Sequence, residues 1–203
     1  NLSIRNNVLN QFAWRGMNLS ATFPTAQIYD NDIYHTAPVT QPSANAFWGI
    51  KFATAGMAGS LLYNNFIHDI QLTNGSSSVI GIYLENGNSS GTRVKVYNNL
   101  VSLGAGIQPI VPLYGIYVYA SSAGLFDIDY NSVYIGGSPS SGSTSSAAFF
   151  KQFSNATLNV RNNIFSNARS NSGTASGTHW GISINNTAGF ITLNYNDYFA
   201  SGT

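Results

Sequence analysis

Apolar and polar residues alternate in short stretches along this chain, and several of these stretches surround a pair of asparagines. The clearest are IRNNVL at 4–9, LYNNFI at 62–67, VYNNLV at 96–101 and VRNNIF at 160–165. Alternation with a period of two is typical of a β-strand with one buried face. Asparagine is depleted in strands. Its return at the same place in each stretch therefore indicates a recurring turn between two strands.

Alignment on the second asparagine of each pair, or on its equivalent, gives a repeat of about 33 residues, with a shorter first interval of 24. The residue three positions before each anchor is always aliphatic, although that column was not used for the alignment. The repeat is therefore a property of the whole pattern and not only of the asparagines. The anchors are Asn7, Asn31, Asn65, Asn99, Asn131, Asn163 and Asn196.

A further apolar stretch, usually Gly-Ile-x-apolar, begins 15 to 18 residues before an anchor. Each unit thus holds three short strands, and no segment shows helical periodicity. Short strands that recur at a fixed period predict a solenoid in which equivalent strands of successive coils pair in parallel. We expect an all-β, right-handed parallel β-helix of about seven coils with three strands per coil. The stretches are GMNL (16–19), GIKF (49–52), GIYL (81–84), GIYV (115–118), AAFF (147–150) and GISI (181–184).

The asparagine pairs are explained by the sharp turn between two strands of one coil. Such a turn needs a residue in the left-handed region, which asparagine tolerates better than most residues. Coils repeat at the interstrand spacing of about 4.8 Å, so a side-chain amide can bond to the asparagine of the coil above and below. We predict that the seven anchors form a hydrogen-bonded asparagine ladder.

The Gly-Ile-x-apolar strand followed by the asparagine pair resembles the right-handed parallel β-helix repeat of the pectate-lyase-like superfamily, across nearly the whole chain. YNSVYIGG (130–137), SSAAFF (145–150) and VRNNIFSNARSNSGT (160–174) are similar to segments of large secreted β-helix proteins of Bacteroidetes-type bacteria. Many such proteins carry a type IX secretion sorting domain, which this sequence does not contain. The resemblance implies an extracellular or bacterial cell-surface location, and it implies no specific activity.

Charged residues make up only 7% of the chain and its formal net charge is +1. An average domain has about 25% charged residues, so asparagine, serine, threonine, glycine and tyrosine must cover this surface. Without a basic run, we expect no nucleic-acid partner. No apolar run approaches the roughly 20 residues of a membrane span. The absence of cysteine excludes disulfides and thiolate metal sites.

Few carboxylates are available for catalysis, because the chain has seven acidic residues in all. Superfamily enzymes cleave polysaccharides with clustered aspartates, and Asp127 and Asp129 lie on one face of a predicted strand. In the alignment, however, Asp127 shares a column with Lys95, and Asp129 shares one with Arg161. We therefore expect two ion pairs between neighbouring coils at these positions.

The remaining acidic residues and histidines give no metal-binding spacing, so we predict no metal and no cofactor. Asp30 stands where other coils have the first asparagine, and we expect it in the same turn. Calcium at Asp30 and Asp32 is the alternative. His68 and Asp69 are neighbours in a strand and should point to opposite faces. His35 and His179 are expected at loops or at the edge of the core.

The outer face of the Gly-Ile-x-apolar strands is where superfamily enzymes bind sugar. We predict carbohydrate binding at its aromatic residues, Tyr83, Tyr117, Tyr119 and Phe149. The alternative is an aromatic ladder that only stabilises the stacked strands, as expected on another face for Tyr29, Tyr63 and Tyr97. The candidates for catalysis there are Glu85 with Lys51 or Lys151, which lack a second carboxylate.

Residues 1–203 are predicted to form one β-helix domain. The first and last coils should expose open strand edges. We expect them to meet other copies, head to tail, or the rest of a longer β-helix. The sequence favours a non-catalytic extracellular structural or adhesive module that associates end to end or binds polysaccharide. The alternative is a polysaccharide lyase or glycoside hydrolase.

Overall fold

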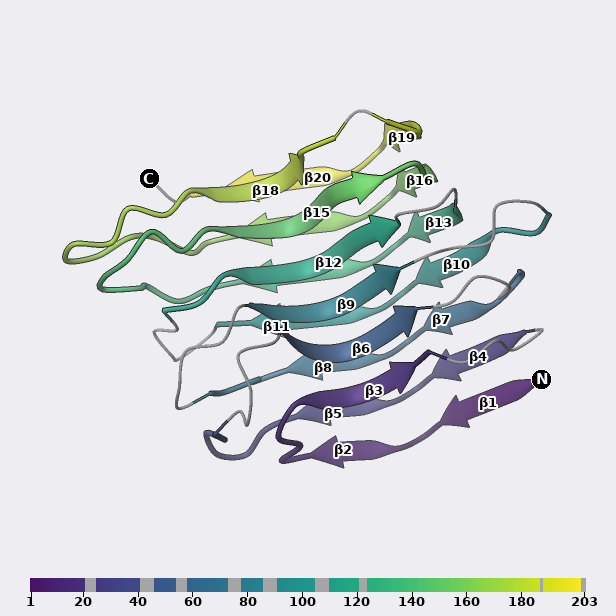
Figure 1. Cartoon of the computed structure of the whole chain (residues 1–203), viewed down its shortest axis with the longest axis horizontal. Helices are drawn as coiled ribbons and strands as arrows, with labels where there is room; N and C mark the ends of the chain where they lie inside the picture. Colours follow the sequence, from purple (N-terminus) through teal and green to yellow (C-terminus); the bar gives the residue numbers. More distant parts are fainter. Residues whose placement is uncertain are drawn as a thin grey trace.

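The chain winds as a parallel β-helix, with its two ends at opposite ends of the stack of coils (Figure 1). The computed structural model describes residues 1–20, 25–40, 46–53, 58–72, 78–85, 91–104, 110–120, 124–186 and 188–201. Within these ranges the regular elements are all β-strands. This confirms the prediction of an all-β solenoid with three strands per coil.

Three parallel sheets run along the stack, two with seven strands and one with six. Sheet A holds the strands that end at the asparagine turn, sheet B those that leave it, and sheet C the Gly-Ile-x-apolar strands. Sheet A contains β1 (Leu2–Arg5), β4 (Ala26–Tyr29), β7 (Leu61–Tyr63), β10 (Val94–Tyr97), β13 (Leu125–Asp129), β16 (Thr157–Arg161) and β19 (Phe190–Asn194). Sheet B contains β2 (Val8–Asn10), β5 (Asp32–Tyr34), β8 (Phe66–His68), β11 (Leu100–Leu103), β14 (Ser132–Ile135), β17 (Ile164–Asn167) and β20 (Asp197–Ala200). Sheet C contains β3 (Arg15–Leu19), β6 (Phe47–Ala53), β9 (Val79–Glu85), β12 (Leu113–Ala120), β15 (Ser146–Ser154) and β18 (His179–Ile184).

The core is a column of inward side chains from all three sheets, one layer per coil. In sheet A the aliphatic residues three positions before the anchors pair directly across coils, and those of the inner coils are fully buried. Stacking aliphatic side chains on one another removes apolar surface from water in every layer. This burial is the main contribution to the stability of such a repeat. The buried members of this column are Ile28, Leu62, Val96, Ile128 and Val160.

The glycine of the Gly-Ile-x-apolar strands lets sheet C approach sheet B closely. A Cβ atom on Gly49 would lie 2.6 Å from Cγ2 of Ile67. At Gly81 and Gly115 the added atom would collide with Val101 and Val133 in the same way. The motif therefore contains glycine because a side chain there would overlap a core side chain of sheet B.

The two asparagines of each pair have separate roles in the turn between sheets A and B. The first position is left-handed in all seven coils, with φ between 53° and 58°. Asp30 occupies it in the second coil, as expected. The second asparagine instead turns its side chain inward, where the five inner anchors are at most 2% exposed. The left-handed positions are Asn6, Asp30, Asn64, Asn98, Tyr130, Asn162 and Tyr195.

The predicted asparagine ladder is confirmed, and it runs without a break from Asn7 to Asn196. At each step the Nδ2 group donates to Oδ1 of the anchor in the next coil, at 2.8 to 3.0 Å. The same oxygen also accepts the backbone N–H of the preceding anchor. The ladder thus satisfies buried backbone and side-chain groups together.

Candidate functional site

The outer face of sheet C does not hold all the residues predicted there. Phe149 pairs with Ile116 and is fully buried in the core, so its assignment to the outward column is wrong. Phe150 stands next to Tyr117 instead. The reason lies in the spacing of paired residues along the sequence. In sheet C, a residue of β12 and its partner in β15 are one position further apart than a residue of β13 and its partner in β16, which belong to sheet A. The alignment assumed one spacing for both sheets.

The same shift removes Lys151 from the outer face. Lys151 pairs with Val118 of the core column and is only 1% exposed. Its ammonium group donates to the carbonyl oxygens of Asn186, at 2.5 Å, and Ala188, at 2.8 Å. Burial lowers the pKa of this ammonium group. Lys151 therefore holds the connection between β18 and β19 and is a wrong candidate for catalysis in the groove.

The other two candidates for catalysis are partners of each other. The Nζ atom of Lys51 lies 2.8 Å from Oε2 of Glu85. The Lys51 ammonium group also lies 4.6 Å from the ring centroid of Trp48 and 5.3 Å from that of Tyr83. A glycosidase needs a second carboxyl group beside the first. The charged side chain that the structure places next to Glu85 is a lysine.

The aromatic residues of sheet C pack mainly against each other. The rings of Tyr83 and Tyr117 stack with centroids 5.2 Å apart, and those of Tyr114 and Phe150 stack at 4.8 Å. Tyr117 is 8% exposed and Phe150 is 6% exposed. Burial raises the pKa of both Tyr83 and Tyr117. Tyr83 and Tyr119 keep intermediate exposure, and carbohydrate binding at these tyrosines stays a prediction.

The outer face of sheet A carries a stack of tyrosines, as expected from the sequence. Tyr29 and Tyr63 are nearly parallel with centroids 4.7 Å apart, and Tyr63 and Tyr97 continue the stack at 4.9 Å. Arg5 covers the first ring, with its Nη1 donating to the Tyr29 hydroxyl at 2.9 Å. The stack stops at Tyr97, because the next residue in this column is Asp129.

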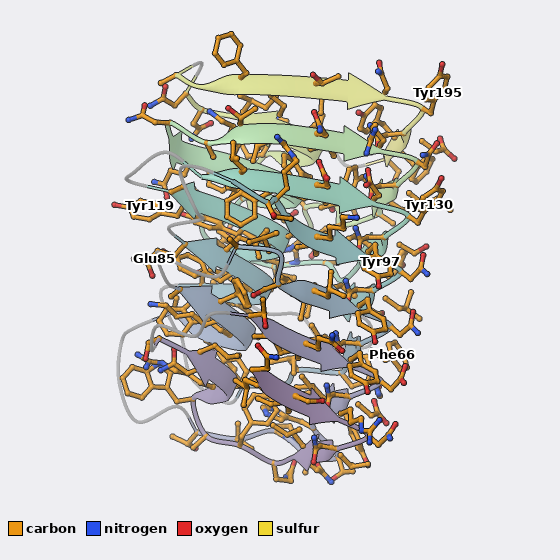
Figure 2. All side chains as sticks on the ribbon, turned by 90° about the vertical axis from the view of Figure 1, so that its right-hand side faces the viewer. Phe66, Glu85, Tyr97, Tyr119, Tyr130 and Tyr195 are labelled. Atoms are coloured by element: carbon orange, nitrogen blue, oxygen red, sulfur yellow. The ribbon has the colours of Figure 1, made fainter. Side chains whose placement is uncertain are left out.

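Beside Tyr97 lies a pocket of about 350 Å³ on the outside of sheet A. Strands β7, β10, β13 and β16 each contribute to it, together with the turn after β13. Figure 2 shows Tyr97 and Tyr130 along the edge of the helix opposite to Glu85 and Tyr119. The pocket is therefore separate from the outer face of sheet C. Its lining residues are Leu61, Lys95, Tyr97, Asp127, Asp129, Tyr130 and Arg161.

One of the two ion pairs predicted at this place is confirmed. Arg161 binds Asp129 at two points, with Nε 3.1 Å from Oδ1 and Nη2 3.1 Å from Oδ2. This contact raises the pKa of the Arg161 guanidinium group. A bidentate contact of this kind fixes both side chains better than a single hydrogen bond.

The predicted pair between Lys95 and Asp127 is wrong. Asp127 accepts instead from Nε of Arg93, at 2.5 Å, and from Nδ2 of Asn159, at 2.8 Å. Arg93 also donates to the carbonyl oxygen of Thr157 at 2.9 Å. The Arg93 guanidinium group thus holds the Asp127 carboxylate and a backbone carbonyl at once, with donors fixed in one plane.

His68 lies on the outer face of sheet B, between two carboxylates. Its Nδ1 is 2.7 Å from Oδ2 of Asp69, and its Nε2 is 2.9 Å from Oδ1 of Asp32. The expectation that His68 and Asp69 point apart is wrong, because Asp69 has φ of 49° and leaves the strand geometry. The imidazole also stacks on Phe66 and on Tyr34.

The other two histidines are buried within the solenoid. The Nδ1 atom of His179 lies 2.9 Å from the Ser146 hydroxyl, and Nε2 lies 3.1 Å from Oδ1 of Asn171. This order of groups resembles a nucleophile with its base, but Ser146 is 0% exposed. The amino-acid sequence does not reveal this group, because its members come from three separate segments. No substrate can reach a hydroxyl that is closed off in this way.

The described part of the chain contains no helix long and apolar enough to cross a membrane. Across the same residues, no group of three or more histidine, aspartate or glutamate side chains is placed to hold a metal ion. Asp30 and Asp32, the candidates for calcium, are occupied by the turn and by the contact with His68.

No protein-family model, curated protein or solved structure matches this chain. Its function is therefore inferred from its own repeat, its fold and the groups on its surface.

Proposed function

We propose that this protein is a non-catalytic extracellular structural or adhesive module of a bacterial cell surface. The observation that carries the proposal is the unbroken ladder from Asn7 to Asn196, whose five inner members are buried. Successive coils are tied together by this ladder and by parallel strand pairing along the three sheets. Such a stack is stiff along its axis and has a neutral, hydrogen-bonding surface, which suits a rod that presents side chains at a distance.

The proposed location rests on the resemblance of the repeat to secreted β-helix proteins. We infer a relationship to the pectate-lyase-like superfamily, and to the Bacteroidetes-type surface proteins within it, from the asparagine turn and the Gly-Ile-x-apolar strand. The low charge and the absence of cysteine are compatible with this location. They give no reason to propose a cytoplasmic role.

We also propose that the end coils associate with further coils, from other copies of the chain or from a longer β-helix. In the last coil, Leu193 is 36% exposed and Tyr198 is 43% exposed. Their partners in the preceding coil, Val160 and Phe165, are completely buried. A further coil would bury this apolar surface and pair the open edges of β19 and β20.

The alternative is a polysaccharide lyase or glycoside hydrolase that uses the outer face of sheet C. A hydrolase would need two neighbouring carboxyl groups, whereas the charged neighbour of Glu85 is Lys51. Support for this alternative is therefore weak. Incubation with uronate-containing and neutral polysaccharides separates the two functions. We expect no release of unsaturated or reducing ends. Release that Glu85→Gln abolishes would overturn the structural proposal.

Light scattering over a range of protein concentrations tests the association of the end coils. It should show growth of linear assemblies, which Leu193→Lys should reduce.

A further inference from the structure

The column of stacked tyrosines on sheet A is interrupted where the pocket begins. Tyr63 covers one face of the Tyr97 ring, at a centroid distance of 4.9 Å. In the next coil the paired residue is Asp129, whose side chain is too short to continue the stack. Both Tyr97 and Asp129 line the pocket. A flat ligand that entered here would take the place of the next ring in the column.

Tyr130 supplies a second aromatic side chain at a conformational cost. It has φ of 58°, in a turn position that asparagine or aspartate occupies in five of the seven coils. A bulky residue is strained in the left-handed region, and such strain is concentrated at functional sites. The side chain is 61% exposed and lines the pocket. Burial in the core therefore does not explain why a tyrosine stands there.

The polar groups of the pocket are arranged around these rings. Asp129 is held by Arg161, and Asp127 by Arg93, so both carboxylates have a cationic partner. Lys95 also lines the pocket, and it forms no ion pair within the described residues. The one uncompensated charge at the pocket is thus a positive one.

We propose that this pocket binds one anionic pyranose unit of a polysaccharide. A pyranose has an apolar face of C–H groups that packs on tyrosine rings, and hydroxyl groups that both donate and accept hydrogen bonds. The face packs on Tyr97 and Tyr130, and the hydroxyls bond to the pair formed by Asp129 and Arg161. A carboxylate or sulfate on the sugar contacts Lys95. A volume of about 350 Å³ is near the lower end of the range for ligand pockets, which fits a single unit.

A simple aromatic ligand fits this arrangement less well than a sugar. It would pack on the rings but would leave the charged groups around them without new hydrogen bonds after displacing their water. The site also lies on sheet A, away from the sheet C groove. The inference goes beyond the proposed structural role, because the ladder holds the rod together whether or not a sugar binds.

The test uses three sugars that differ only at one carbon, namely glucose, glucuronate and glucose 6-sulfate. Each is titrated into the isotopically labelled chain while the backbone amide signals are followed by NMR. We expect saturable shifts at Lys95, Asp129 and Tyr130 with an anionic sugar, and affinity at least about tenfold weaker for glucose. The carboxylated and sulfated sugars show which anionic group the site takes. Equal affinity for all three, or no shift at these amides, would overturn the proposal.

Two variants test the residues, each with a matched control. Lys95→Gln should remove the preference for the anionic sugar, whereas Arg5→Gln, at the far end of the tyrosine stack, should leave it unchanged.

Tyr130→Asn should weaken binding about tenfold or more while raising the melting temperature, because asparagine relieves the strained turn. Tyr195→Asn makes the same change in a turn outside the pocket, and it should raise stability without affecting binding. Wild-type binding by Tyr130→Asn would rule out the site.

Discussion

The side-chain amide of Asn99 donates to Oδ1 of Asn131 at 3.0 Å, and both residues are only 1% exposed. The same Nδ2 group also lies 2.9 Å from the carbonyl oxygen of Leu62 and 3.2 Å from that of Tyr97. One buried amide thus connects three successive coils. Asn98, its neighbour in sequence, is exposed and serves only the left-handed turn.

Replacing Asn99 by alanine should strongly destabilise the protein. The change removes the acceptor of the Asn65 backbone N–H and one donor to the Leu62 carbonyl, and a buried group left without its partner costs about 1 to 3 kcal/mol. We expect the free energy of unfolding to fall by about 2 to 4 kcal/mol, measured by urea denaturation.

The matched control is Asn98→Gly, in the adjacent position. Glycine adopts a positive φ without steric strain, so this change should alter the free energy of unfolding by less than about 1 kcal/mol. Asn98→Val should cost more than Asn98→Gly, because a β-branched residue is strained there. If Asn98→Gly and Asn99→Ala were equally harmful, the two asparagines would not have separate roles.

Replacing Gly115 by alanine should also destabilise the solenoid. The added Cβ would overlap Cγ1 of Val133 and approach the carbonyl oxygen of Ala148, at 2.6 Å. Overpacking of this kind costs about 1 to 3 kcal/mol. Adding Val133→Ala should recover part of the loss, because it removes the methyl group that collides. Thermal unfolding of the single and double variants checks this. A double variant that lost more stability than the two single variants lose together would contradict it.

Stability should fall on mild acidification, because His35 is buried as a neutral side chain. Its Nδ1 lies 3.0 Å from the carbonyl oxygen and 3.2 Å from the backbone nitrogen of Gln71, and its Nε2 lies 3.1 Å from the carbonyl oxygen of Phe12. Burial lowers the pKa of His35, and burial with the charge of Arg169 lowers that of His179.

Because both folded-state pKa values lie below those of the unfolded chain, the unfolded state binds more protons as the pH falls. The contribution of these two neutral histidines to stability is fully present above about pH 6.5, the usual pKa of histidine. It is lost as the pH falls through the folded-state pKa values. We expect a lower urea midpoint at about pH 5 than at about pH 7.5. NMR titration of the His35 ring should give a midpoint below about 6.5, and a midpoint above that value would contradict the prediction.

The fold could be predicted because each of its rules acts within one repeat. The alternation of apolar residues specifies which face of a strand is buried. The column three positions before the anchors, from Ile4 to Leu193, pairs coil by coil as the alignment requires. The stacking of Tyr29, Tyr63 and Tyr97 follows from the same register.

The surface was harder to predict, because it depends on the number of residues in each connection and on how far long side chains reach. A difference of one residue between sheets moved Phe149 and Lys151 into the interior. Arg93 lies just before β10, outside the predicted strand column, and still reaches Asp127. Asp69 contacts His68 only because its backbone turns left-handed.

The amino-acid sequence by itself determined the repeat, the three strands of each coil and the asparagine ladder. These features follow from local periodicity and from the need to satisfy buried amides at a regular spacing. Only the tertiary structure decided which outer aromatic residues stay exposed, which cation meets each carboxylate, and where the tyrosine stack ends in a pocket. Those outcomes depend on the stacking of neighbouring coils, because outer side chains such as Asp127 and Asp129 are fixed by contacts with residues 32 to 34 positions away.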